Sequence, residues 1–246
     1  MPSTRDELAA ARARIIVALD LPTSADARAL AQRLADRPGL FKVNAQLFTE
    51  SGPEMVRWLV ERGERVFLDL KYHDIPHIVA EACVRAADLG ASLLTVHTSG
   101  GPKMLAAARK ALEKHAGSRR PRLLGVTLLT SLSREEAKRI GFSSTVERNV
   151  VRLARMAKAS GCDGVIAAPS DVRAVRRACG RRFLVITPGI HAAGCPKVHD
   201  QARVATAADA IRAGADKVVV GRAVYGALSP VRAFDQLAWE IAAALR

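Results

Sequence analysis

The strongest constraint on the fold is an alternation that runs through all 246 residues of the sequence. Short apolar runs with β-branched residues alternate with longer segments whose apolar residues recur at helical spacing, and this pair occurs eight times. The runs that we predict to be strands lie at 14–19, 40–43, 66–70, 92–97, 123–128, 164–167, 183–186 and 217–220. Eight repeats in about 250 residues favour a single-domain (β/α)8 TIM barrel over an open parallel sheet, which usually has fewer strands.

The same pattern sets the expected domain organisation and location. Residues 1–13 are predicted to form a short N-terminal helix, and residues 14–246 the barrel that carries the catalytic site. No apolar run reaches the length of about 18 residues that a membrane span needs, and the start of the chain lacks the apolar core of a signal peptide. The four cysteines show no paired spacing, which predicts free thiols and no metal site. We therefore expect a cytoplasmic protein without a membrane partner.

The net charge of +14 raises the question of a polyanionic partner. The densest basic clusters, at 119–122, 176–177 and 181–182, fall in predicted connections after helices, and no aromatic residues are interleaved with them. Binding of single-stranded nucleic acid usually combines basic residues with an aromatic stacking platform. We therefore predict a solvated basic surface and no nucleic-acid partner.

Polar or small residues stand at the ends of six predicted strands. They are Asp20, Lys42, the pair Asp69 and Lys71, His97, the pair Thr130 and Ser131, and the pair Gly221 and Arg222. The C-terminal ends of the strands in a (β/α)8 barrel form the rim of the active site. We therefore expect these residues, which are far apart in the sequence, to converge on one mouth of the barrel.

The segment 69–76, Asp-Leu-Lys-Tyr-His-Asp-Ile-Pro, lies between the third predicted strand and a helical pattern. Asp69 and Lys71 are two residues apart, so on an extended backbone their side chains would project to the same face. Asp74 lies on the following turn, from which its side chain could approach the pair, and the helix begins at Ile75-Pro76. Two carboxylates would then bracket one ammonium, an arrangement that is costly to bury unless each charge has a partner and a task. This segment is therefore the predicted centre of the site.

Two loops near the end of the chain indicate a phosphate site. The loop 186–190 follows the seventh predicted strand and offers backbone N–H groups, and Gly221-Arg222 begins a helix after the eighth. The loops after strands seven and eight are where such barrels commonly bind phosphate. Gly221 would allow a close approach of the backbone, and Arg222 could make a bidentate contact.

From Ile15 to the final helix the sequence resembles the orotidine 5'-phosphate decarboxylase family, bacterial type, most specifically in 69–76. Further motifs similar to those of the family, in the expected order, are Val17-Ala-Leu-Asp20, Phe41-Lys-Val43, Thr95-Val-His97, Thr187-Pro-Gly-Ile190, Asp200-Gln201 and Val220-Gly-Arg222. The resemblance implies a homodimeric barrel that converts orotidine 5'-phosphate to uridine 5'-phosphate and carbon dioxide, the last step of pyrimidine nucleotide synthesis. It also implies that no cofactor or metal takes part.

The resemblance also implies residue roles. Lys71 would protonate C6 of the pyrimidine. Asp69 would lie beside the substrate carboxylate, and Lys42 would bridge Asp69 and the ribose. Asp74 and Ile75 would reach across the dimer interface into the neighbouring site. The remaining substrate-binding residues would be Asp20 for the ribose, Thr130 or Ser131 for the pyrimidine, and Pro188, His191, Gln201, Gly221 and Arg222 around the phosphate.

Two positions depart from the family pattern. His191 stands where bacterial members usually have an arginine that binds phosphate, and Asn44 stands where glycine usually follows Lys42-Val43. A neutral imidazole offers one donor where a guanidinium offers a charged fork, so we expect phosphate binding to be weaker by about 1–2 kcal/mol. Lys197 or Arg203 could compensate for this loss.

Two other functions are compatible with parts of the pattern. The first is a metal-dependent sugar-phosphate decarboxylase or synthase of the same barrel superfamily, which shares the Asp-x-Lys-x-x-Asp spacing. His73 to Pro76 and the position of Lys42 argue against it. The second is a non-catalytic barrel that binds a nucleotide or a polyanion, although binding alone does not need four charged residues in the arrangement of Lys42, Asp69, Lys71 and Asp74.

Overall fold

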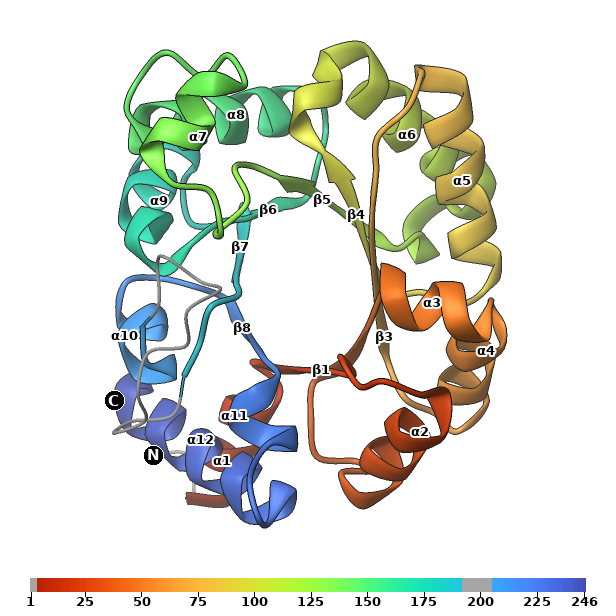
Figure 1. Cartoon of the computed structure of the whole chain (residues 1–246), viewed down its shortest axis with the longest axis vertical. Coiled ribbons are helices and arrows are strands. Elements are labelled where there is room, and N and C mark those ends of the chain that lie inside the picture. The colour runs from red at the N-terminus through yellow and green to blue at the C-terminus, as the bar shows by residue number, and fades with distance from the viewer. Residues whose placement is uncertain (1–3, 192–204) are drawn as a thin grey trace.

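The chain folds into a closed barrel of parallel strands, seen in a computed structural model that describes residues 4–191 and 205–246. Within these residues eight strands pair in chain order, and β1 closes the ring by pairing with β8 (Figure 1). The strands are β1 (Ile15–Ala18), β2 (Leu40–Asn44), β3 (Val66–Tyr72), β4 (Leu93–His97), β5 (Arg122–Val126), β6 (Gly164–Ile166), β7 (Leu184–Thr187) and β8 (Lys217–Val220). The predicted (β/α)8 barrel is confirmed, and no strand boundary differs from its predicted position by more than two residues.

Helices surround the ring of strands (Figure 1). They are α1 (Thr4–Arg12), α2 (Ser24–Arg33), α3 (Ala45–Ser51), α4 (Glu54–Glu61), α5 (Pro76–Asp88), α6 (Gly101–Ala116), α7 (Arg134–Arg139), α8 (Val146–Ala159), α9 (Val172–Cys179), α10 (Ala207–Arg212), α11 (Arg222–Tyr225) and α12 (Pro230–Leu245). The first of them, α1, lies within the predicted 1–13 helix and packs against α12, where Arg12 pairs with Asp235 at 2.9 Å.

Alternation along the strands creates two apolar layers. The layer inside the barrel is formed by Ile16, Ala18, Leu40, Phe67, Leu93, Leu124, Ile186 and Val219. Their neighbours along the strands, such as Phe41, Leu68 and Leu94, pack outward against the helices. Each such side chain contributes about 1.5–3 kcal/mol when it is fully buried. The inner layer fills the barrel on the N-terminal side of the strand ends. We call this layer the floor, because it lies beneath the C-terminal ends of the strands.

Two carboxylates brace the N-terminal ends of the strands. Asp163, just before β6, accepts the Leu123 N–H of β5 at 2.8 Å and two hydrogen bonds from Arg120 at 2.6 and 2.8 Å. Asp216, just before β8, likewise accepts the Val185 N–H of β7 and a bond from Arg176, each at 2.7 Å. The same kind of brace thus recurs at two points around the ring.

The predicted solvated basic surface is therefore wrong for part of the basic clusters. The side chain of Arg120 is only 9% exposed and that of Arg176 only 16%. Burial alone would raise the pKa of Asp163, but the hydrogen bonds from Arg120 and from the Leu123 N–H hold it below its usual range. These arginines are paired because a buried carboxylate needs a nearby positive charge.

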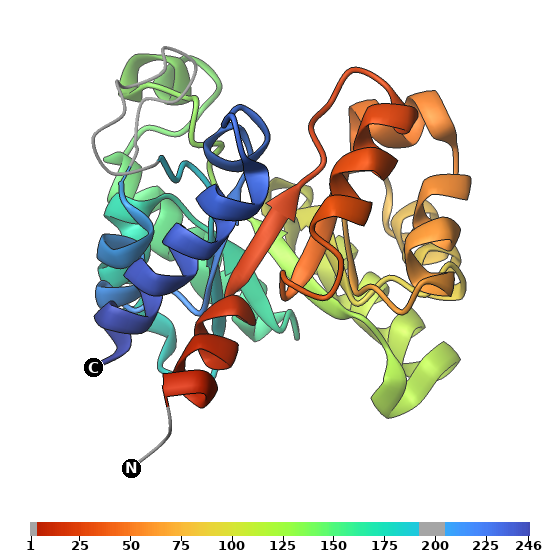
Figure 2. The ribbon, with the colours of Figure 1, turned by 90° about the horizontal axis from the view of Figure 1, so that it is seen from below.

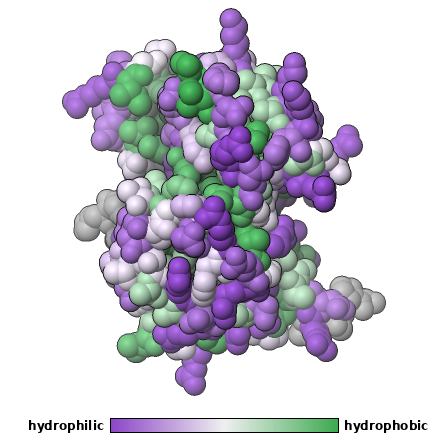
Figure 3. Space-filling model, turned by 90° about the vertical axis from the view of Figure 1, so that its right-hand side faces the viewer, coloured by the Kyte–Doolittle hydropathy of each residue, from purple (hydrophilic) through white to green (hydrophobic). Residues whose placement is uncertain are grey.

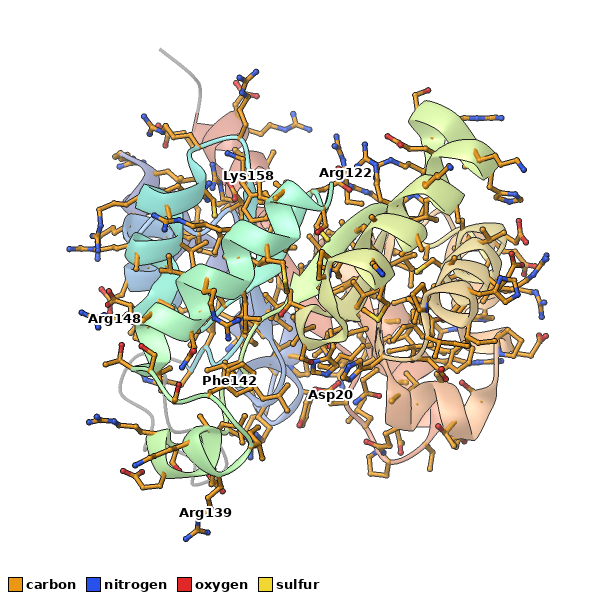
Figure 4. All side chains as sticks on the ribbon, turned by 90° about the horizontal axis from the view of Figure 1, so that it is seen from above. Asp20, Arg122, Arg139, Phe142, Arg148 and Lys158 are labelled. Carbon is orange, nitrogen blue, oxygen red and sulfur yellow. The ribbon has the colours of Figure 1, made fainter. Side chains whose placement is uncertain are left out.

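The two ends of the barrel have different roles. Helix α1 and the C-terminal end of α12 lie on the side opposite α7 (Figure 2), and Asp20 and Arg122 lie at opposite ends of the barrel (Figure 4). The braced end carries the starts of the strands, and the other end carries Asp20 and the ends of β2, β3 and β4, where Lys42, Asp69, Lys71 and His97 lie. In the part of the chain that the structure describes, none of the helices combines the length and the apolar character that a bilayer crossing would need.

Candidate active site

The strands β2, β3 and β4 place three polar side chains inside the barrel, two residues beyond the apolar floor. Leu40, Phe67 and Leu93 belong to the floor, and Lys42, Asp69 and Thr95 follow each of them at the next inward position. All three polar residues are buried, Thr95 completely. A period of two along each strand therefore explains why these side chains meet at the mouth.

An unbroken row of alternating charges crosses this part of the mouth. Lys42 Nζ lies 2.9 Å from Asp20 Oδ1 and 3.7 Å from Asp69 Oδ2, and Lys71 Nζ lies 2.8 Å from the same Asp69 oxygen. The side chains of Lys42 and Asp69 are 8% and 11% exposed, whereas those of Lys71 and Asp20 are 35% and 37% exposed. The row is therefore buried at its centre and open to a substrate at both ends.

The electrostatic state of Asp69 follows from this row. Burial alone would raise the pKa of Asp69, but Lys71 and Lys42, together with hydrogen bonds from Lys71 and Thr95, lower it below the usual value. Asp69 is therefore ionised at neutral pH. The Lys71 Nζ, 2.8 Å from this carboxylate, therefore lies directly against a negative charge.

The backbone at Lys71 differs from the predicted extended strand. Lys71 has φ 52°, in the left-handed region, and the pairing of β3 with β4 shifts register between Leu68 and Tyr72. The Lys71 N–H donates a hydrogen bond to the hydroxyl oxygen of Thr95, at 3.0 Å. Asp69 and Lys71 do meet, as expected, but through a bulge and not through the regular pleat.

Thr95 is the residue of the site that sequence reasoning missed. Its motif with Val96 and His97 belongs to the family resemblance, but no role was predicted for its side chain. A threonine in an apolar strand is typical of ordinary strand propensity. The available signal was its position in β4, inward and level with Asp69, which only the strand register reveals.

Asp74 and Ile75 lie on the turn between β3 and α5. The Asp74 carboxylate accepts the N–H of Ile75 at 2.6 Å, and Ile75 is 63% exposed. Pro76 begins α5 in its first turn, as predicted. Asp74 is exposed on this turn, whereas Lys71 pairs with Asp69.

His97, at the end of β4, lies beside the row of charges. Its ring centroid is 5.4 Å from that of His73. Burial, His73 and Lys71 together lower the pKa of His97, so its ring is neutral at pH 7.

The loops after β7 and β8 approach the same mouth. Pro188 follows β7, and Gly189, at φ 79°, turns the chain so that His191 donates its N–H to the Ala205 carbonyl at 3.2 Å. Gly221 lies against Asp20, because a Cβ built on it would be 3.8 Å from Asp20 Oδ2. Arg222 is exposed and begins α11, as predicted.

For the remaining predicted residues, the structure gives either a place in a turn or no description. Thr130 and Ser131 lie in the turn between β5 and α7, since β5 ends at Val126, two residues before its predicted end. Gln201 lies outside the described residues, as do Asp200, Lys197 and Arg203. Among the described residues, no group of three or more His, Cys, Asp or Glu is arranged to hold a metal ion.

Asn44, which departs from the family pattern, has a structural task. It is the N-cap of α3, and its side-chain oxygen accepts the Leu47 N–H at 2.9 Å. A glycine could not supply this hydrogen bond. The departure therefore stabilises a helix next to the mouth and leaves Lys42 in place.

Comparisons with known proteins find relatives that cover nearly the whole chain. Residues 13–237 match the family described as "Orotidine 5'-phosphate decarboxylase / HUMPS family". A protein of Trichlorobacter lovleyi named orotidine 5'-phosphate decarboxylase is 44% identical, over 99% of this chain and 100% of its own length. One from Geobacter sulfurreducens with the same name is 45% identical, over 98% and 99%. The crystal structure of orotidine 5'-phosphate decarboxylase from Lactobacillus acidophilus superposes with a TM-score of 0.81 at 35% identity, covering 92% of this chain and 98% of that one.

Proposed function

The chain belongs to the orotidine 5'-phosphate decarboxylase family, and on that premise we propose that it converts orotidine 5'-phosphate to uridine 5'-phosphate and carbon dioxide. This reaction is the last step of de novo pyrimidine nucleotide synthesis. The observation that carries the proposal is the row Asp20, Lys42, Asp69 and Lys71, which presents one partly exposed ammonium beside a buried, ionised carboxylate. We propose that the protein acts in the cytoplasm.

The reaction needs a stabilised carbanion and a proton. When the bond from C6 to the carboxylate carbon breaks, carbon dioxide leaves and the electron pair stays on C6, which has no conjugated group to accept it. An ammonium fixed next to C6 stabilises this negative charge and then donates a proton to it. We assign this role to Lys71. Its amine recovers a proton from water, and Asp69, 2.8 Å away, holds the side chain in place for the next turnover.

The other residues of the mouth would bind the substrate. Asp20 and Lys42, which are 2.9 Å apart, are suited to the ribose hydroxyls, because one accepts and the other donates hydrogen bonds. For the pyrimidine we propose Thr130 or Ser131, and for the phosphate Pro188, His191, Gln201, Gly221 and Arg222. Binding energy from a phosphate remote from C6 can be used for closure and positioning.

We also propose that the enzyme is a homodimer whose partner subunit receives Asp74 and Ile75. Two large apolar side chains at the start of α5 support this, since Ile75 is 63% exposed and Ile78 is 47% exposed. Hydrophobic areas interrupt the mostly hydrophilic face seen in Figure 3. Exposed apolar side chains that cluster in this way are typical of a surface that is covered in the assembly.

Subunit mixing tests the shared site. Lys71→Ala and Asp74→Ala should each be inactive alone, because each homodimer lacks one of the two groups at both sites. A mixed dimer would contain one complete site, so refolding the two variants together should restore about a quarter of the wild-type activity. If the mixture stays inactive although both variants form dimers, Asp74 does not act across the interface.

The alternative activity, metal-dependent decarboxylation or synthesis of a sugar phosphate, is favoured by one observation, namely that the description of the matched family joins both groups. The test is the loss of orotidine 5'-phosphate, followed by ultraviolet absorbance with a chelator present, against turnover of hexulose and keto-gulonate phosphates with magnesium. The proposal expects turnover only in the first assay. Activity confined to the second would replace it by the alternative.

A further inference from the structure

The backbone at Lys71 adopts a conformation that needs support. Between the paired positions Leu68↔Leu94 and Tyr72↔Val96, β3 advances four residues while β4 advances two. The extra length is taken up in a bulge in which Lys71 has φ 52°. A residue with a Cβ is strained in this region, at a cost of about 1–3 kcal/mol, and persists there only when surrounding contacts hold it.

Thr95 supplies contacts that hold this conformation. Its hydroxyl accepts the N–H of Lys71 at 3.0 Å and donates to Asp69 Oδ1 at 2.9 Å. The Thr95 side chain is completely buried, so water cannot take over either bond. One hydroxyl therefore fixes the backbone of one charged residue and the carboxylate of the other.

The second of these bonds also orients the carboxylate. Because Oδ1 of Asp69 is bonded by Thr95, its other oxygen faces the two lysines, 2.8 Å from Lys71 Nζ and 3.7 Å from Lys42 Nζ. If the carboxylate rotated away from this orientation, it would no longer hold the Lys71 ammonium in position. The geometry thus links a buried threonine on β4 to the position of the proton donor on β3.

We propose that Thr95 is a positioning residue of the reaction, which holds the bulge at Lys71 and the orientation of Asp69. This inference rests on the proposed function. Thr95 acts through these two residues and supplies no proton itself. A hydroxyl is required, because an apolar side chain of the same shape would leave the Lys71 N–H and one Asp69 oxygen buried without their partner.

A kinetic series separates this role from simple packing. Thr95→Val should lower kcat by about 30-fold or more while KM changes by less than about 3-fold, because the loss falls on the group that acts in the transition state. Thr95→Ser should stay within about 3-fold of the wild type, since it keeps the hydroxyl. The acid limb of the pH profile of kcat should move upward in Thr95→Val, because Asp69 loses a donor to its charged form.

Thr98→Val is the matched control. Thr98 is also completely buried, and its hydroxyl donates to the Val126 carbonyl at 2.7 Å, away from Lys71 and Asp69. This variant should lose stability but keep its kcat. If Thr95→Val does not fold, Thr95→Ser and Thr95→Ala replace it as a pair of similar volume, and the serine should be at least about 10-fold more active. Equal kcat values in the pair, or an equal loss in Thr98→Val, would overturn the proposal.

A stability measurement tests the conformation independently of any activity. At a φ of 52° glycine is unstrained and alanine is not, so Lys71→Gly should melt at a higher temperature than Lys71→Ala. In a regular strand the order would be the reverse. Failure of the wild type to turn over orotidine 5'-phosphate would remove the proposed function and leave this comparison intact. A higher melting temperature for Lys71→Ala would show that the backbone at position 71 needs no support. It would thereby overturn the proposed role of Thr95.

Discussion

Replacing Asp69 by asparagine tests the row of charges as a unit. The asparagine keeps the shape of the side chain and a bond to Thr95, but it removes the negative charge that lies between Lys42 and Lys71. Breaking a fully buried ion pair costs about 3–5 kcal/mol. Lys42 keeps Asp20 at 2.9 Å, and Lys71, 35% exposed, can turn towards water. We therefore expect Asp69→Asn to lower the free energy of unfolding by about 2–4 kcal/mol at pH 7.

The assay is urea and thermal unfolding of both proteins across a pH series. A loss of about 3 kcal/mol corresponds to a fall in Tm of about 6–12 °C for a chain of this size. The pKa of Asp69 is lower in the folded chain than its usual value of 3.8. Its contribution to stability is therefore fully present above that pH and is lost as the pH falls through the lower folded pKa. The difference between the two proteins should be constant at neutral pH and shrink below about pH 4.

Glu54→Gln is the control, because Glu54 pairs with Arg57 at 2.8 Å while both side chains are about half or more exposed. A surface pair of this kind contributes about 0–1 kcal/mol, so this variant should unfold almost like the wild type. The reasoning is refuted if Asp69→Asn is as stable as the wild type at neutral pH. It is also refuted if the difference between the two persists unchanged in acid.

Two further predictions concern the phosphate loop and the barrel wall. His191→Ala should raise KM for orotidine 5'-phosphate by about 5- to 30-fold, corresponding to a contact of about 1–2 kcal/mol. An unchanged KM would show that His191 does not touch the phosphate. Gly164→Ala should cost more than about 3 kcal/mol or prevent folding, because its Cβ would lie 2.4 Å from the carbonyl oxygen of Leu184 on the adjacent strand. Denaturation curves that coincide with those of the wild type would contradict this clash.

The barrel and the identity of its mouth could be predicted from sequence because both depend on local patterns. The eight strands are short apolar runs, and residues such as Asp20, Lys42 and Asp69 stand where those runs end. Once the strands are parallel and closed, their C-terminal ends must meet. The alternation of side chains along β2 and β3 then places Lys42 and Asp69 on the inward face of the barrel wall.

Other features could not be predicted, because they depend on the pairing of distant strands. The spacing of Asp69 and Lys71 is the same in a regular strand and in a bulge, and only the register with β4 distinguishes them. For the same reason Thr95 could not be distinguished from an ordinary strand residue. The basic cluster at 119–122 appeared to be solvated because Asp163, which pairs with Arg120, is 43 residues away in sequence.

The central claim is that the ammonium of Lys71 carries the chemical step. The measurement that tests it most directly is kcat for orotidine 5'-phosphate in the presence of a chelator, compared among the wild type, Lys71→Ala and Lys103→Ala, an exposed lysine on α6. We expect full turnover by the wild type and by Lys103→Ala, and a loss of at least about 10³-fold in Lys71→Ala. A folded Lys71→Ala enzyme that keeps kcat within about 10-fold of the wild type would contradict the account.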